Sequence, residues 1–123
     1  MRDEGPIRLE KLDVWREAIQ FAALVYELTR GFPHRERFGL TNQMRRAAVS
    51  ISSNIAEGSS RGSRPDFSRF VEIATGSLFE VVSPAPVSQR QGLLSDDEHK
   101  RIYATAENQS RMLSGLRRSL VER

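Results

Sequence analysis

The chain has 123 residues, 38% of them hydrophobic and 28% charged, which fits one soluble globular domain and excludes an intrinsically disordered chain. Its net charge is only +3, but every basic residue except Lys11 and Lys100 is an arginine, the side chain that suits phosphate recognition and bidentate carboxylate pairs alike. The sequence has no cysteine and no apolar run long enough for a membrane span or a secretory signal, which excludes disulfides and thiolate chemistry and predicts a cytoplasmic protein.

The first residues lack the periodicity of a helix. Residues 1–10 mix charges with Gly5 and Pro6, and we expect them to form a flexible N-terminal arm. Residues 11–123 are expected to form a single domain, because a chain of this length has no room for a second core.

The first helix is predicted from Leu12 to about Thr29, where apolar residues recur at steps of three and four. They form two adjacent stripes, with Val14, Ala18, Phe21, Val25 and Leu28 in the first and Trp15, Ile19, Ala22 and Tyr26 in the second. Together the stripes are wider than packing on one helix requires. An isolated bundle would leave one of them partly exposed, so we expect the second stripe to be a homo-oligomer face.

The second helix is predicted from Thr41, acting as its N-cap, to about Glu57, with Gly58 ending it. Before it, Gly31 and Pro33 are expected to stop the first helix, the glycine by tolerating a positive φ. The buried seam of the second helix is Met44, Ala48, Ile51 and Ile55. Small residues beside this seam predict close approach of neighbouring helices.

The third helix is predicted to start near Ser63, with Pro65 and Asp66 in its first turn. Its buried residues are expected to be Phe67, Phe70, Val71, Ala74, Leu78 and Val81. Pro84 and Pro86 cannot occupy the interior of a regular helix, because each lacks a donor and clashes with the preceding turn. We therefore expect a break or a sharp kink there.

The last helix opens with a capping box formed by Ser95 and Glu98. Its seam is Ile102, Ala106, Gln109, Leu113, Leu116 and Leu120, in which only the glutamine is polar. Four amphipathic helices with short links and no convincing strand predict an all-α, antiparallel up-down four-helix bundle whose third helix is interrupted near Pro84 and Pro86.

Catalytic machinery is not recognisable in the sequence. A di-iron bundle needs two Glu-x-x-His pairs, and the nearest match is a single Asp96-x-x-His99 in a helix first turn, so we expect no metal. There is no phosphate-binding P-loop and no nucleophile elbow, and His34 and His99 are expected at the surface. We therefore predict a binding protein without cofactors rather than an enzyme.

A polar stripe formed by Arg46, Ser50, Asn54 and Glu57 follows the second helix beside its apolar seam. Arg46 and Glu57 are about 16 Å apart along a helix axis, so each should find its partner on another helix or another chain. The stripe fits a structural network that fixes helix register, and it also fits a subunit interface or a ligand contact. The spacing alone leaves these interpretations open.

Seven arginines are candidates for contact with nucleic-acid phosphates. Two adjoin the polar stripe, two lie before the third helix and three lie on the last helix: Arg45, Arg46, Arg61, Arg64, Arg111, Arg117 and Arg118. A solvated surface is the competing interpretation for most of them.

The run from Gln43 to Gly58, QMRRAAVSISSNIAEG, closely resembles the signature of the 23S rRNA intervening-sequence protein family, also called the four helix bundle protein family. The likeness extends to Val14-Trp15, Tyr26 to Thr29, Phe38 to Leu40 and Ile73 to Leu78, and covers most of residues 11–120. It implies a four-helix protomer that assembles into a ring, typically a pentamer, with no known enzymatic activity.

Some members of that family are encoded inside intervening sequences of bacterial ribosomal RNA genes. A related branch resembles the accessory protein of diversity-generating retroelements, which binds a reverse transcriptase and nucleic acid. The resemblance therefore implies an oligomeric protein that associates with RNA or DNA, and as the alternative a scaffold for a protein partner such as a polymerase. The matching polar residues are Arg45, Arg46, Ser50, Asn54 and Glu57, with Arg61 just after.

Two segments depart from the family pattern. Ser52 stands where many relatives have proline, which should make the second helix more regular. Relatives have a leucine-rich continuation of the third helix where this chain has residues 83–91, and the two segments have the same length. Two compensating frameshifts or natural variation would explain the replacement. Because fewer apolar side chains face the last helix here, we expect this end of the bundle to be looser.

Overall fold

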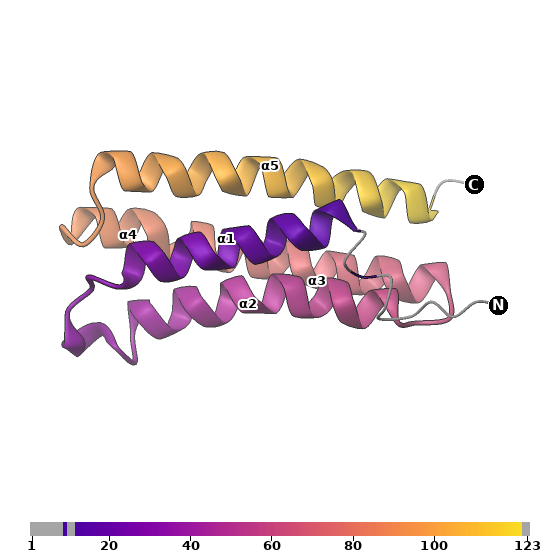
Figure 1. Cartoon of the computed structure of the whole chain (residues 1–123), viewed down its shortest axis with the longest axis horizontal. Coiled ribbons are helices and arrows are strands. Elements are labelled where there is room, and N and C mark those ends of the chain that lie inside the picture. The colour runs from indigo at the N-terminus through magenta and orange to yellow at the C-terminus, as the bar shows by residue number, and fades with distance from the viewer. Residues whose placement is uncertain (1–8, 10–11, 122–123) are drawn as a thin grey trace.

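The computed structural model describes Leu9 and residues 12–121 (Figure 1). Its α-helices are α1 (Asp13–Thr29), α2 (Leu40–Ser59), α3 (Arg64–Val82), α4 (Pro84–Arg90) and α5 (Asp96–Val121), and a short 3-10 helix, η2, spans His34–Glu36. No β-strand occurs in this described part. α1, α2, α3 and α5 lie side by side with alternating directions, and α4 extends α3 (Figure 1). The predicted all-α up-down four-helix bundle is confirmed.

The core runs along the bundle axis, because each helix turns an apolar stripe inward. α1 and α3 each pack between α2 and α5. The predicted first stripe of α1 and the predicted seam of α2 are buried throughout: Val14, Ala18, Phe21, Val25, Leu28, Met44, Ala48, Ile51 and Ile55. Periodicity alone therefore located the buried face of both helices.

The start of α2 corrects the prediction for Thr41. The helix begins at Leu40 behind Gly39, which provides no side-chain cap, and Thr41 lies inside the first turn. The backbone N–H of Leu40 donates instead to Oε1 of Glu36, 3.1 Å away. A carboxylate is favourable at a helix N-terminus, so η2 supplies the cap from four residues upstream.

Gly58 also differs from its predicted role, because α2 continues through it to Ser59. The glycine is buried at the crossing with α3, where a Cβ would lie 2.8 Å from both Cδ1 of Phe67 and Cβ of Phe70. Gly58 therefore allows close helix packing rather than ending the helix. Phe67 and Phe70 are half-buried against it rather than fully buried as predicted.

α3 and α4 form one bent rod. The side chain of Ser63 caps α3 by accepting from the backbone N–H of Asp66 at 3.2 Å, as predicted. Ser83, between the two helices, keeps helical angles of φ −69° and ψ −45°. Pro84 and Pro86 fall in the first turn of α4. Backbone N–H groups in a first turn have no acceptor within the helix, so the N–H that proline lacks breaks no hydrogen bond inside α4. The predicted interruption is confirmed, as a bend between consecutive helices.

The link from α4 to α5 contains the one positive φ among the described residues, +78° at Gly92. The N–H of Leu93 bonds the carbonyl of Ser88 at 2.8 Å and that of Gly92 bonds Gln89 at 3.0 Å, which together form a Schellman motif. α1 ends at Thr29, just before Gly31 and Pro33 as predicted, but Gly31 does not adopt a positive φ. α1 ends in tighter turns, with the N–H of Arg30 bonded to the carbonyl of Glu27 at 3.3 Å.

The predicted capping box of α5 is confirmed in both directions. The N–H of Glu98 donates to Oγ of Ser95 at 3.1 Å, and the N–H of Ser95 donates to Oε1 of Glu98 at 2.9 Å. Ile102, Ala106, Gln109 and Leu113 are buried, and Leu116 and Leu120 are half-buried. Nε2 of Gln109 donates to the carbonyl of Val14 at 3.2 Å, while its Oε1 has no partner among the described residues.

The predicted N-terminal arm, residues 1–10, lies outside the described residues except for Leu9. Leu9 packs against the core, and its carbonyl accepts from the N–H of Leu12 at 2.9 Å. At this position the chain is therefore already part of the bundle.

Candidate nucleic-acid interface

The middle of the polar stripe joins α2 to α3. Oγ of Ser50 lies 2.9 Å from Oγ of Ser77, a buried residue of α3 that the sequence pattern did not reveal. Nδ2 of Asn54 donates to the carbonyl of Ser50 at 2.8 Å and to its Oγ at 3.0 Å. These side chains satisfy one another across the helix pair, as a network that fixes register would.

The two ends of the stripe behave differently. Oε2 of Glu57 pairs with Nη2 of Arg61 at 2.7 Å, so its partner is on the turn following its own helix rather than on another helix or chain as predicted. Arg46 is exposed and contacts no carboxylate of the described residues. It lines an open groove between α2 and α3, together with the exposed Glu80.

Four of the seven candidate arginines are used in contacts within the chain. Arg45 donates from Nε to Oγ1 of Thr29 at 2.8 Å, and Arg61 pairs with Glu57 and covers the ring of Phe70 at 4.8 Å from its centroid. Two more link α3 to the C-terminal half of α5: Arg64 donates to the carbonyls of Ser119 and Leu120, and Arg117 pairs with Glu72. Their guanidinium groups hold helices together.

Arg46, Arg111 and Arg118 remain without a partner within the described part of the chain. Arg111 and Arg118 lie two turns apart on the exposed face of α5, about 10.5 Å along the axis, so their side chains project from one face. α2 packs on α1 and α3, so Arg46 belongs to a different face. The structure thus does not bring the seven candidates together.

The sequence pattern missed a second basic group at the end of the bundle where α1 turns into α2. Arg30, His34 and Arg37 lie in this turn, and the fold brings them to one hollow with Arg45 of α2. Folding back of the chain creates this cluster, so helical periodicity could not reveal it.

The second stripe of α1 is divided between core and surface. Ile19 and Tyr26 are 43% and 42% exposed, whereas Trp15 and Ala22 are half-buried against the core. The guanidinium of Arg45 covers the ring of Tyr26 at 4.5 Å from its centroid. The uncovered apolar surface of this candidate oligomer face is therefore narrower than the sequence indicated.

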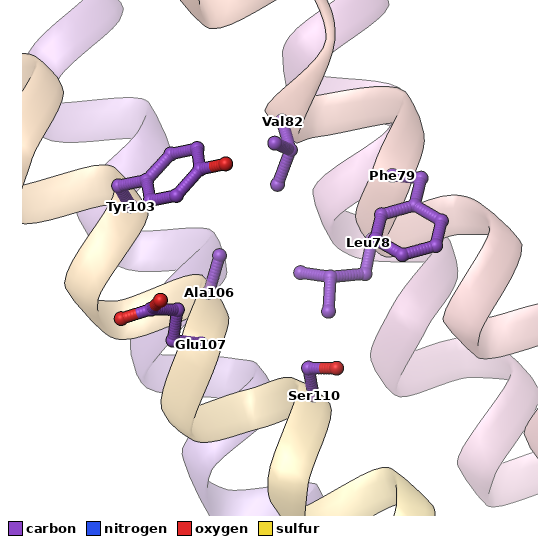
Figure 2. Close-up of a pocket in the computed structure, with 7 residues that line it drawn as sticks. All are labelled: Leu78, Phe79, Val82, Tyr103, Ala106, Glu107 and Ser110. Carbon is purple, nitrogen blue, oxygen red and sulfur yellow. The ribbon is translucent and has the colours of Figure 1, made fainter.

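A second apolar surface lies between α3 and α5, and Figure 2 shows the side chains that surround it. Phe79 and Tyr103 are 60% and 47% exposed and stand on opposite helices, with Leu78 between them. They border a hollow of about 140 Å³. Phe79 is a large apolar residue outside the predicted buried seam of α3. Its position in the sequence could therefore have indicated this surface.

The Asp96-x-x-His99 pair takes part in local packing. Oδ1 of Asp96 accepts from Nε2 of Gln89 at 2.6 Å, and the ring of His99 stacks on Tyr103 with 5.7 Å between centroids. His34 is exposed as predicted, but His99 is only half-exposed, and its Nε2 is buried with no partner in the described part of the chain. Among the described residues, no three metal-ligating side chains gather in one place.

The comparisons with known proteins agree with this fold. A family model described as 23S rRNA-intervening sequence protein matches residues 10–115. The crystal structure of a protein of unknown function from the S23 ribosomal protein family of Bacteroides thetaiotaomicron is similar, with a TM-score of 0.74 at 20% identity, over 89% of this chain and 99% of that one. No curated protein sequence matches significantly. In the part of the chain that the structure describes, no helix is long and apolar enough to cross a membrane.

Proposed function

The chain belongs to the 23S rRNA-intervening sequence protein family, and from this premise we propose that it is a non-enzymatic, homo-oligomeric protein that associates with RNA or DNA through backbone phosphates. The observation that carries the proposal is the pair formed by Arg111 and Arg118. Both project from one exposed face of α5, and no carboxylate of the described residues lies within 4 Å of their guanidinium groups. Phosphate oxygens are the acceptors that such guanidinium groups suit.

Self-association follows from the apolar side chains that the single chain leaves uncovered. Ile19 and Tyr26 on α1 and Phe79 on α3 expose apolar surface that a second copy would remove from water. A pentamer is the assembly that the family resemblance implies, and we propose it for this chain. Light scattering of the purified protein should give a mass several times 14.0 kDa. A monomeric mass in dilute buffer contradicts the assembly.

The salt dependence of binding tests the nucleic-acid association. Two phosphate contacts to a single strand predict that affinity falls about sevenfold between roughly 50 and 200 mM salt, and more steeply if other basic residues take part. Fluorescence anisotropy with a labelled single-stranded RNA measures this slope. Binding that does not change with salt, or no binding at all, contradicts the proposal.

A matched pair of variants assigns the binding to these residues. Arg111→Ala/Arg118→Ala removes two arginines that have no partner among the described residues, and we expect a shallower salt slope. Arg69→Ala/Arg101→Ala removes the same charge from arginines that face Asp66 at 3.5 Å and Glu27 at 3.8 Å, and should bind nearly as well as the natural chain. Equal loss in both variants would mean that only net charge matters.

The surface between α3 and α5 favours a second candidate, a scaffold for a protein partner. Phe79 and Tyr103 frame an apolar hollow of a size that one side chain of a partner can enter. A partner recovered after nuclease treatment, and lost with Phe79→Ser but not with Phe38→Ser, supports this function. Phe38 is the matched control because it is 83% exposed and does not line this hollow.

A further inference from the structure

The turn between α1 and α2 encloses a hollow of about 210 Å³ at one end of the bundle. Four basic residues line it: Arg30, His34, Arg37 and Arg45. Arg30 follows the last residue of α1, His34 begins η2, Arg37 follows η2, and Arg45 comes from the second turn of α2. The hollow is therefore assembled from four successive pieces of local structure.

Acidic side chains do not line this hollow, and the nearby acids have other partners. Glu36, the one carboxylate of the turn, accepts from the N–H of Leu40 at 3.1 Å. Glu27, on the last turn of α1, faces Arg101 of α5 at 3.8 Å. No carboxylate of the described residues lies within 4 Å of the guanidinium groups of Arg30, Arg37 or Arg45. None of the three is therefore neutralised by an ion pair within the described residues, and the guanidinium of Arg37 lies over the ring of Phe38, 5.3 Å from its centroid.

Arg45 is held in place as a binding group would need to be. Its Nε donates to Oγ1 of Thr29 at 2.8 Å, its Nη2 reaches the carbonyl of Tyr26 at 3.4 Å, and its plane covers the Tyr26 ring. Thr29 is itself fixed, since it is buried and donates to the carbonyl of Val25 at 2.8 Å. A guanidinium has five N–H donors, so Arg45 keeps donors free after making these bonds.

We infer that this hollow binds a phosphate group. Three arginines and a histidine line the space, and a phosphate offers acceptors in several directions together with one to two negative charges. The hydroxyl of Thr41 also lines the hollow and adds a neutral donor. The hollow, at about 210 Å³, is larger than the volume that several water molecules occupy in the liquid. A tetrahedral anion therefore fits in it together with part of its hydration shell.

The phosphate group could belong to a nucleic-acid backbone or to a free phosphate or phosphomonoester, because the contacts are the same. The inference does not rest on the proposed function: the hollow lies at the α1–α2 end, and the arginines that carry the proposed function are on the face of α5. In a nucleic-acid complex it would add a contact to a second face of the protein.

The test follows arginine side-chain N–H resonances of the full chain by NMR during titration with inorganic phosphate at constant ionic strength. Arg45 is the reporter, since the bond to Thr29 protects its Nε–H from exchange. We expect saturable shifts, and Arg30→Gln/Arg37→Gln should weaken binding at least about tenfold. Arg35→Gln/Arg90→Gln removes the same charge from exposed arginines that do not line the hollow, and should change binding less than about twofold.

Shifts that do not saturate, or equal weakening in the two double variants, overturn the inference. A single-stranded DNA decamer without a terminal phosphate identifies the source of the phosphate group. If the decamer shifts the same resonances and inorganic phosphate displaces it, the source is a nucleic-acid backbone. If only inorganic phosphate shifts them, the source is a free phosphate or phosphomonoester. Saturable phosphate binding with no nucleic-acid binding anywhere contradicts the proposed function and leaves the phosphate site standing.

Discussion

The contact between α2 and α3 and the turn between α1 and α2 use polar residues in opposite ways. At the contact, Ser50 bonds to Ser77 and Asn54 bonds to Ser50, and Gly58 allows the same two helices to pack closely at Phe67 and Phe70. At the turn, basic residues line a common space and have no acidic partner in the part of the chain that the structure describes. Polar groups whose partners lie within the chain stabilise the fold, whereas convergent groups that lack such partners are available for a ligand.

The first prediction tests the contact between α2 and α3 at Gly58, where the two helices pack most closely. Gly58→Val should lower the free energy of unfolding by about 2–3 kcal/mol, because the new side chain meets Phe67 and the Cβ of Phe70 and the helices must separate. Gly76→Val is the matched control: Gly76 lies in α3 with open space around it, so the change should stay within about 0.5 kcal/mol. Urea unfolding measures both. A Gly58 variant as stable as its control contradicts the close-packing role.

The second prediction separates two adjacent arginines. Arg45→Ala removes bonds to Thr29 and Tyr26, and should lower the free energy of unfolding by about 1–2 kcal/mol while also weakening phosphate binding. Arg46→Ala removes an exposed side chain with no partner in the described part of the chain, and should change stability by less than about 0.5 kcal/mol. Thermal unfolding and the phosphate titration supply the measurements. Equal effects of the two variants would remove the distinction.

Arg45 and Arg46 also show what the sequence could and could not predict. Apolar periodicity located the core, and local motifs located the Ser95 cap and the bend before Pro84, because these depend on residues a few positions apart. Adjacent residues on a helix point about 100° apart. Arg45 and Arg46 are chemically identical, so only the packing of the helices determines which of them contacts the end of α1. The cap from Glu36 escaped prediction because it requires the intervening 3-10 turn.

The third prediction concerns the polar side chain of Gln109 in the hydrophobic core. Gln109 is fully buried in the seam of α5, and its Oε1 has no partner among the described residues. Gln109→Met keeps a similar shape without the unsatisfied acceptor, and should raise the free energy of unfolding by about 1 kcal/mol. Gln43→Met, at an exposed position of α2, should leave it within about 0.5 kcal/mol. A loss of stability in the Gln109 variant would mean that the bond to the Val14 carbonyl outweighs the unpaired oxygen.

The smallest expected effect is the coupling between Ser50 and Ser77. Ser77→Ala leaves the Ser50 hydroxyl without its partner on α3, and Ser50→Ala leaves the buried Ser77 hydroxyl without a partner. The double variant has neither hydroxyl left unpaired, so it should be more stable than the sum of the single changes predicts, by about 0.5–1 kcal/mol. Ser53→Ala, at an exposed position of the same helix, should combine additively with Ser77→Ala. Additive behaviour of both pairs would show that the hydroxyls are merely adjacent, and that the small residues here act through close packing alone.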